Sequence, residues 1–144
     1  MAAAAKALDP AIWVVGVEPE LAADALASRR AGRIVELPVA QVARTAADGL
    51  RVQRVGAVPW PHLEAHVDEI VTVTEAEIRE AVRAVADQAR LMAEPSGATP
   101  VAAALAGRGG SGAPPERRVA VLGGGNVDAA TYAAIIGEHV APPP

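Results

Sequence analysis

Apolar positions along the chain alternate between continuous runs of strand length and stretches with helical spacing. Runs such as 12–17 (IWVVGV) and the β-branched run 69–74 are typical of strands in a sheet that is covered on both faces. Because the two patterns alternate, we expect an α/β fold with a partial, open, mostly parallel sheet and flanking helices. The expected strands are 12–17, 33–37, 69–74 and 118–122; the expected helices are 2–8, 21–30, 48–53, 62–66, 75–92, 98–106 and 128–137.

Local signals define several of the helix ends. Pro10 ends the first helix because proline cannot continue the hydrogen-bond ladder, and Gly32 is a candidate C-cap. Thr74 and Glu77 form a predicted capping box that begins the longest helix. Its inner face should carry Ile78, Val82, Val85 and Ala89.

Composition changes this picture in a few respects. The 144 residues suit one domain, and 51% of them are hydrophobic, but Ala alone accounts for 35 and Phe is absent. A core of such small side chains depends on close backbone packing. The Gly/Pro/Ser-rich segment 108–116 should be an exposed loop, residues 1–140 the folded part, and 141–144 a disordered tail.

Charge and residue usage exclude several classes of function. The net charge is −4 with no basic stripe, which disfavours nucleic-acid binding. The absence of cysteine excludes disulfides, thiolate zinc sites and cysteine nucleophiles. No apolar stretch reaches 18 residues and no signal-peptide pattern begins the chain, so we expect a cytoplasmic protein without a membrane contact. Lys6 is the single lysine, hence the single candidate for Schiff-base chemistry.

Three acidic residues follow the first expected strand, namely Glu18, Glu20 and Asp24. The carboxyl edge of an open α/β sheet is where ligands bind, and carboxylates gathered there offer hard oxygen ligands to Mg²⁺ or Ca²⁺. Acidic residues also favour a helix N-terminus through its dipole alone. Spacing leaves both interpretations open.

A glycine loop, GGGN at 123–126, joins an expected strand to an expected helix. Its glycines allow an anion to approach the free N–H groups at a helix start. A dinucleotide site is disfavoured, because Asp128 occupies the third glycine position and no second strand–helix unit can follow. The corner EPSG at 94–97 is typical of a helix end followed by a new N-cap, Ser96.

Histidine and serine residues give weaker signals. His62 and His66 are four residues apart but lack an HExxH pattern, and together with His139 we expect them on the surface or in packing roles. The serines lack the Gly-x-Ser-x-Gly context of a nucleophile; they are Ser28, Ser96 and Ser111.

The order of five segments is more specific than any one of them. VGVEPE at 15–20, TAADG at 45–49, DEIVTVT at 68–74, EPSGA at 94–98 and VLGGGNVD at 121–128 occur in one chain. This series resembles the C-terminal half of the threonine/serine dehydratases and serine racemases, which are fold-type II pyridoxal-phosphate (PLP) enzymes. The resemblance implies the large-domain part of the tryptophan synthase β-like fold.

The resemblance implies a cofactor and a reaction. Members of the family are lyases that convert L-threonine or L-serine to a 2-oxo acid and ammonia, with PLP as an electron sink. Their Schiff-base lysine and their phosphate-binding glycine loop lie N-terminal to every segment matched here, and Lys6 matches an ordinary helix-surface position. The resemblance therefore implies a C-terminal fragment with no catalytic residue of its own, inactive alone.

Site residues can be transferred one at a time from the resemblance. Glu18, the carbonyl of Ala22 and Asp24 match a divalent-cation site for Mg²⁺, Ca²⁺ or Mn²⁺. The cofactor-facing positions are Gly49, Glu94, Gly123, Gly124, Gly125 and Asn126. If these face one cofactor, the acidic corner and the glycine loop must lie together.

One position departs from the family pattern. The family has Ser where this chain has Gly123, and that hydroxyl usually meets the pyridine nitrogen of the cofactor. Glycine has no hydroxyl to contact the pyridine nitrogen, so the sequence does not show which group would tune the cofactor as an electron sink.

Two further hypotheses remain beside the fragment of a dehydratase. The chain could be the non-catalytic half of a split enzyme whose partner is the missing N-terminal half, or it could form a homo-oligomer, as family members do. It could instead be a small anion- or nucleotide-binding α/β module built on residues 123–126. The amino-acid substrate, threonine or serine, and the choice between dehydration and racemisation stay open.

Overall fold

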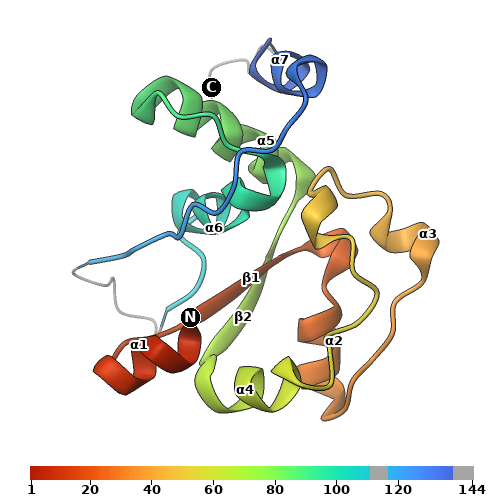
Figure 1. Ribbon diagram of the computed structural model, residues 1–144, viewed down its shortest axis with the longest axis vertical. Helices are drawn as coiled ribbons and strands as arrows, with labels where there is room; N and C mark the ends of the chain where they lie inside the picture. The colour runs from red at the N-terminus through yellow and green to blue at the C-terminus, as the bar shows by residue number, and fades with distance from the viewer. Residues whose placement is uncertain (111–116, 138–144) are drawn as a thin grey trace.

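The computed structural model describes residues 1–110 and 117–137, which form helices around a short parallel sheet (Figure 1). The helices are α1 (Ala2–Leu8), α2 (Asp24–Ala31), α3 (Val39–Val42), α4 (Pro59–His66), α5 (Glu75–Ala84), α6 (Pro95–Leu105) and α7 (Ala129–Gly137). Shorter turns are η1 (Glu20–Ala22), η2 (Asp48–Leu50) and the π-helical η3 (Val85–Ala89).

Within the described ranges the sheet consists of β1 (Val15–Pro19) and β2 (Glu69–Val73). The two strands are parallel and in register, with Val15 opposite Glu69 and Pro19 opposite Val73. Both strands are buried at their carboxyl ends and partly exposed before them. The expected parallel α/β arrangement is thus confirmed, and both carboxyl ends lie at one edge, beside η2 and α6 (Figure 1).

The core lies between α5, α6, α7 and the carboxyl end of β2. Its largest fully buried apolar side chains are Ile78, Ile135, Val73 and Val82, and most of its other members are alanines. Small side chains bury little area each, so the elements must approach closely to exclude water. The alanine-rich helices therefore pack closely against one another, most extensively α5 against α6.

The predicted helix ends agree with the structure at two positions. Gly32 caps α2 in the left-handed region at φ 63°, which glycine adopts without steric cost. The capping box is complete: Thr74 Oγ1 accepts from the Glu77 N–H at 3.2 Å, and Glu77 Oε2 accepts from the Thr74 N–H at 2.7 Å. Two orphan backbone donors are thereby satisfied where β2 passes into α5.

Two predicted strands are wrong. Residues 33–37 form no strand because their N–H groups find other partners: Val35 donates to Ser28 Oγ at 2.9 Å and Leu37 donates to the Gln53 carbonyl at 2.8 Å. Residues 118–122 are not paired with any described strand either. The Arg118 side chain instead holds this segment to the carbonyls of Arg108 and Gly109.

The helix predicted over 75–92 is shorter than expected. α5 ends at Ala84, and the π-helical turn η3 follows and stops at Arg90, whose φ is 57°. Ile78, Val82 and Val85 are buried as predicted, whereas Ala89 is exposed. The wider π turn rotates the chain away from helical spacing, so an inner-face position after it no longer points inward.

The remaining differences concern short helices and segments outside the described residues. α3 was not expected, and α6 begins at Pro95 instead of residue 98. Residues 111–116 and 138–144 lie outside the described part, so the expected loop tip, the tail, Ser111 and His139 stay predictions. Within residues 1–110 and 117–137, no helix has the length and apolar character needed to cross a membrane.

Candidate functional site

The first group of predicted site residues lies between β1 and α2. Glu18 is in β1 and points at the start of α2, where its Oε1 accepts from the Ala25 N–H and its Oε2 from the Leu26 N–H, each at 2.9 Å. Asp24 opens that helix and is only 3% exposed, and Ala22 is 1% exposed. The structure therefore brings all three predicted residues together.

The electrostatics of this pair is unfavourable. Burial raises the pKa of Glu18 above its ordinary value, against the lowering effect of the two N–H groups of α2, and nearby Asp24 raises it further. Burial also raises the pKa of Asp24, which shares a side-chain hydrogen bond with Glu18. Two carboxyl groups withdrawn from water and close to each other gain from a shared proton or a cation between them.

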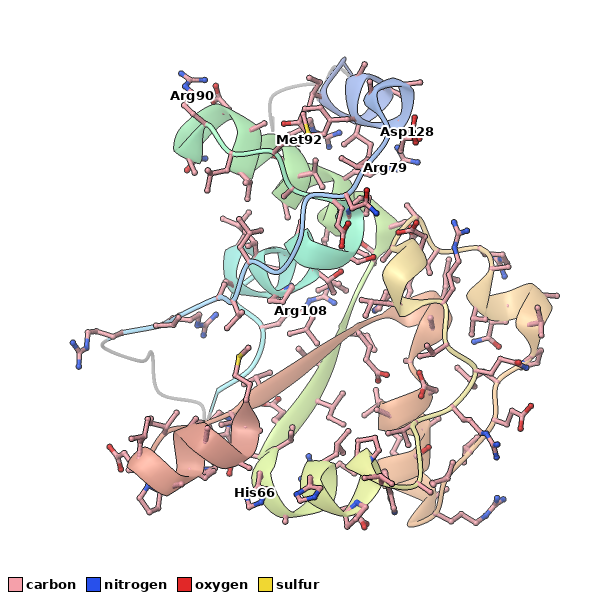
Figure 2. All side chains as sticks on the ribbon, viewed as in Figure 1. His66, Arg79, Arg90, Met92, Arg108 and Asp128 are labelled. Atoms are coloured by element: carbon pink, nitrogen blue, oxygen red, sulfur yellow. The ribbon has the colours of Figure 1, made fainter. Side chains whose placement is uncertain are left out.

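No fuller cluster of side-chain ligands surrounds that pair. Across residues 1–110 and 117–137, no three His, Cys, Asp or Glu side chains are gathered in a way that could hold a metal ion. His62 and His66 stack on each other with ring centroids 6.1 Å apart, on α4 at the far end of the molecule from α7 (Figure 2). They do not contribute to this group, in agreement with the surface role expected for them.

The second group joins the start of α6 to the glycine loop. Glu94 is the N-cap residue of α6, and its Oε2 accepts from the Asn126 N–H at 2.9 Å. The Glu94 N–H donates to the Gly124 carbonyl at 3.3 Å, and the Gly123 N–H donates to the Gly97 carbonyl at 3.5 Å. The acidic corner and the glycine loop thus lie together, as a shared cofactor pocket requires.

Glycine is required at three of these positions, at two of them by close backbone approach and at the third by a positive φ and the nearby Glu94 side chain. A Cβ on Gly97 would lie 2.5 Å from the Gly123 carbonyl oxygen, and one on Gly125 would lie 2.7 Å from the Met92 carbonyl oxygen. Gly124 has φ 108°, and a Cβ there would be 2.5 Å from Glu94 Oε1. Gly123 differs, because its Cβ direction meets no atom within 4 Å and faces open space.

Gly49 joins the same group through Ser96. The Gly49 N–H donates to Ser96 Oγ and to Asp48 Oδ1, each at 2.9 Å. The expected N-cap role of Ser96 is wrong: Glu94 occupies the N-cap position, and the Ser96 hydroxyl serves as the link between α6 and η2. A serine inside the first turn of a helix is free to make such a contact because its hydroxyl is not needed at the cap.

Lys6 lies at the other end of the sheet. Its Nζ is 2.7 Å from Asp68 Oδ2, immediately before β2 begins, whereas Glu94 and Gly49 lie beyond the end of that strand. The amino and carboxyl ends of a five-residue strand are about 17 Å apart. The only lysine is therefore a structural ion-pair partner, remote from the glycine loop.

Sequence reasoning missed one acidic residue near this group. Glu75 follows β2, and its Oε2 accepts at 2.7 Å from the N–H of Ala46, within the TAADG segment. Its Oε1 is buried without a hydrogen-bond partner in the described part of the chain. A carboxylate directly after a strand marks the carboxyl edge of a sheet, but Glu75 also begins the predicted helix, where the helix dipole alone favours an acidic residue.

The anion-binding interpretation of the glycine loop is disfavoured by the same contacts. The Asn126 N–H, which an anion would use, already donates to the Glu94 carboxylate. A fixed negative charge there also opposes a second anion. The glycine loop instead packs its backbone against the start of α6, and Gly123 is the loop glycine whose Cβ direction is open.

Comparison with known proteins agrees with this arrangement. Residues 1–124 match the family model described as pyridoxal-phosphate dependent enzyme. The chain is 40% identical over 131 residues to a serine racemase of Arabidopsis thaliana, covering 89% of this chain and 38% of the relative. It is 36% identical over 138 residues to an L-threonine ammonia-lyase of Geobacter sulfurreducens, covering 94% of this chain and 33% of that protein.

Solved structures give the same result. A threonine deaminase from T.th. superposes with a TM-score of 0.73 at 41% identity, over 88% of this chain and 44% of that one. Threonine deaminase isoform 2 from Solanum lycopersicum superposes with a TM-score of 0.78 at 28% identity, over 92% of this chain and 38% of that one. The chain thus spans less than half the length of these relatives. By sequence and by fold, it belongs to the family of pyridoxal-phosphate dependent enzymes that includes threonine ammonia-lyases and serine racemases.

Proposed function

We propose that the chain forms the cofactor-facing C-terminal part of a PLP-dependent threonine or serine dehydratase. The observation that carries the proposal is the junction of Glu94 with the glycine loop, held by the Asn126 N–H at 2.9 Å. This junction lies at the carboxyl edge of a parallel sheet, where α/β proteins bind their ligands. The relatives named as threonine ammonia-lyases support the reaction, and those named as serine racemases support the amino-acid substrate class.

The residues of this junction fit one side of a PLP site. PLP supplies an electron sink for the carbanion that forms when an amino acid loses its α-proton. Gly49 and residues 123–126 would line the cofactor with backbone, and Glu94 would fix the loop. The open space at Gly123 is the feature that leaves room for a ring beside the wall.

Gly123 gives this proposal a direct variant. In the dehydratase family a serine hydroxyl at this position meets the ring nitrogen of the cofactor. A Cβ added at Gly123 would face open space. We expect Gly123→Ser to fold as well as the parent and to strengthen PLP binding in the completed enzyme. Equilibrium dialysis with PLP measures the effect, and weaker binding by Gly123→Ser would contradict this orientation of the loop.

The chain alone is proposed to be inactive, because its single lysine is paired with Asp68 away from the glycine loop. The purified chain is mixed with PLP, and we follow the absorbance of a PLP–lysine bond and the release of 2-oxobutyrate from L-threonine. We expect neither signal. Lys6→Ala is the control, and a band together with product release, both lost in Lys6→Ala, would overturn the proposal of inactivity.

Activity is expected when the rest of the family fold is supplied. The probe is the part of the Geobacter sulfurreducens L-threonine ammonia-lyase that this chain does not match, expressed together with the chain. We expect release of ammonia from L-threonine, reduced by Glu94→Gln and unchanged by Glu64→Gln, an exposed glutamate on α4. Equal activity of the two variants would remove Glu94 from the site.

A divalent cation at Glu18, the Ala22 carbonyl and Asp24 is a further part of the proposal. Two carboxyl groups of raised pKa in mutual contact support it, since a cation between them would offset their repulsion. We expect millimolar Mg²⁺, Ca²⁺ or Mn²⁺ to raise the melting temperature of the parent and to leave that of Asp24→Asn unchanged. An equal rise in both proteins would show that the cation acts elsewhere.

A further inference from the structure

We propose that His62 and His66 bind a divalent transition-metal ion, Zn²⁺ or Cu²⁺, with water completing its coordination. Both histidines lie on α4, four positions apart, and their ring centroids are separated by 6.1 Å. The pair lies at the opposite end of the molecule from Met92 and Asp128, which flank the glycine loop (Figure 2). This inference therefore does not depend on PLP binding.

The helical spacing places both imidazole rings on one face of α4. Residues four apart in an α-helix lie one above the other, with their Cβ atoms about 5–6 Å apart. The two rings are stacked, with an angle of 23° between their planes. Pro59 opens the helix, where its fixed φ suits the first turn and restricts the backbone. The backbone thus holds the two rings at a defined spacing before an ion binds.

The ring nitrogens of both histidines are available as ligands. Neither imidazole makes a hydrogen bond or an ion pair with any residue in the described ranges. His62 is exposed and His66 is half-buried, so one ring is anchored against the protein while the other is free to adjust. Neutral imidazole is the commonest side-chain ligand of transition metals, and it suits both zinc and copper.

The separation of the two rings is compatible with one shared ion. A zinc–nitrogen bond is about 2.0–2.1 Å long, so the centre of a coordinated imidazole lies about 3 Å from the metal. Two rings on one ion therefore have centres no more than about 6 Å apart. The observed 6.1 Å is at this limit, and a small rotation of the exposed His62 side chain brings both rings onto the ion.

The position of the pair within α4 also favours a cation. His66 is the last residue of the helix, where carbonyl groups without intrahelical partners leave a partial negative charge. None of the residues of α4 is buried, and a helix of eight residues is marginal without packing. An ion that joins its last two turns would therefore stabilise α4 and the start of β2, three residues further on.

The donor set determines which ions bind. Two nitrogen ligands disfavour Mg²⁺ and Ca²⁺, which prefer oxygen, and Cu²⁺ binds such sites more tightly than Zn²⁺. The described part of the chain holds no third His, Cys, Asp or Glu placed to complete the set. Water fills the remaining positions, so the affinity is below that of a closed zinc site with four protein ligands.

Isothermal titration of the untagged chain with ZnCl₂ and with CuCl₂ at neutral pH tests the site. We expect Cu²⁺ to bind more tightly than Zn²⁺, and His62→Asn and His66→Asn each to weaken both at least tenfold. His62 is exposed, so His62→Asn is the substitution that disturbs the fold least. Circular dichroism checks that each variant is folded.

Two matched variants separate this pair from other ligands. His139→Asn removes the third histidine of the chain, and Glu64→Gln removes an exposed carboxylate from α4 itself. We expect both to bind Zn²⁺ as the parent does. Hydrogen exchange then locates the ion: Zn²⁺ should slow exchange at the Val67 amide, which donates to the Leu63 carbonyl at 3.1 Å, in the parent but not in His62→Asn.

Several results would overturn the proposal. They are equal Zn²⁺ binding by the parent and both histidine variants of α4, an equal loss in His139→Asn, and Mg²⁺ binding as tight as that of Zn²⁺. Loss of Zn²⁺ binding in Asp24→Asn but not in His66→Asn would assign the ion to the carboxyl pair beside α2. None of these readouts uses PLP or catalysis, so their failure is distinct from failure of the proposed dehydratase function.

Discussion

At the scale of single residues, glycines and carboxylates determine what the site can be. Gly97 and Gly125 let backbone segments touch, while Gly123, in the same loop as Gly125, leaves space. Burial raises the pKa of Glu18 and of Asp24, and for Glu18 the two N–H groups at the start of α2 offset this effect only in part. The glycines therefore allow segments to pack closely, whereas the two buried carboxyl groups repel each other when both are charged.

The glycines give a matched stability prediction. In Gly97→Ala the new Cβ would lie 2.5 Å from the Gly123 carbonyl oxygen, so backbone must move. We expect the free energy of unfolding to fall by about 1–3 kcal/mol, measured by urea denaturation. Gly123→Ala meets no atom within 4 Å and is the control. An equal loss in both variants would contradict the tight packing of the loop on α6.

The buried carboxylates give a prediction about pH. The pKa of Glu18 is raised above its ordinary value of 4.5, so the folded chain holds this proton to higher pH than the unfolded chain. Its contribution to stability is therefore lost as pH rises through the folded pKa. We expect the melting temperature without divalent cations to fall as the pH rises above the ordinary Glu18 pKa of 4.5, and Glu18→Gln to flatten that fall. The same slope in Glu18→Gln would contradict the assignment.

At the scale of elements, the junctions carry the site. Thr74 joins β2 to α5 as the N-cap of that helix, and Glu75 follows it and accepts from the Ala46 N–H. Glu94 is the N-cap of the next helix, α6. The π-helical turn after α5 ends at Arg90 and is followed by Met92, whose carbonyl packs against Gly125 (Figure 2). The path of the chain between α5 and α6 thus fixes one wall of the glycine loop.

The capping box predicts a measurable loss at this junction. Thr74→Ala removes the oxygen that accepts from the Glu77 N–H, at the point where a strand passes directly into the most amphipathic helix. We expect a loss of about 1 kcal/mol in the free energy of unfolding. Thr74→Ser keeps the oxygen and should restore most of it. If serine and alanine are equally destabilising, the cap hydrogen bond is not the cause.

At the scale of the whole molecule, contacts distant in sequence hold the ends of the sheet. The ion pair between Lys6 and Asp68 joins α1 to the start of β2 across 62 positions. Asp68 also accepts from the Val14 N–H at 2.7 Å, so one carboxylate ties the first helix, the first strand and the second strand together. The Arg108 side chain, which follows α6, joins β2 to α5 because it donates both to the Thr72 carbonyl and to Glu77 (Figure 2).

Asp68 predicts the opposite pH dependence from Glu18. The hydrogen bond from Lys6 lowers the pKa of Asp68, so its contribution is present above the ordinary value of 3.8 and is lost as pH falls through the folded pKa. We expect Asp68→Asn to lower the free energy of unfolding at neutral pH by about 1–2 kcal/mol and to flatten the acid limb. The control is Asp87→Asn, in an ion pair that is about four-fifths exposed. Equal effects of the two variants would contradict a structural role for the Lys6 pair.

Much of the fold follows from local signals. The bounds of α1, the Gly32 cap and the Thr74 capping box each depend on residues within a few positions, and the structure agrees with each. The order of the five segments also pointed to the family that the comparisons show. Local steric and hydrogen-bond preferences suffice for such features because their partners are adjacent in the chain.

Tertiary structure decided the features whose partners are distant. Residues 118–122 have a strand pattern, but a strand needs a neighbour, and the described fold places a groove beside them instead. Ser96 has the local character of a cap, yet η2 approaches it and its hydroxyl accepts from the Gly49 N–H. The sequence alone determined the bounds of α1, the helix caps at Gly32 and Thr74, the parallel α/β class and the family. Which glycines are in contact, where Lys6 lies and which strand edge stays open were decided only by packing, because each depends on groups far apart along the chain.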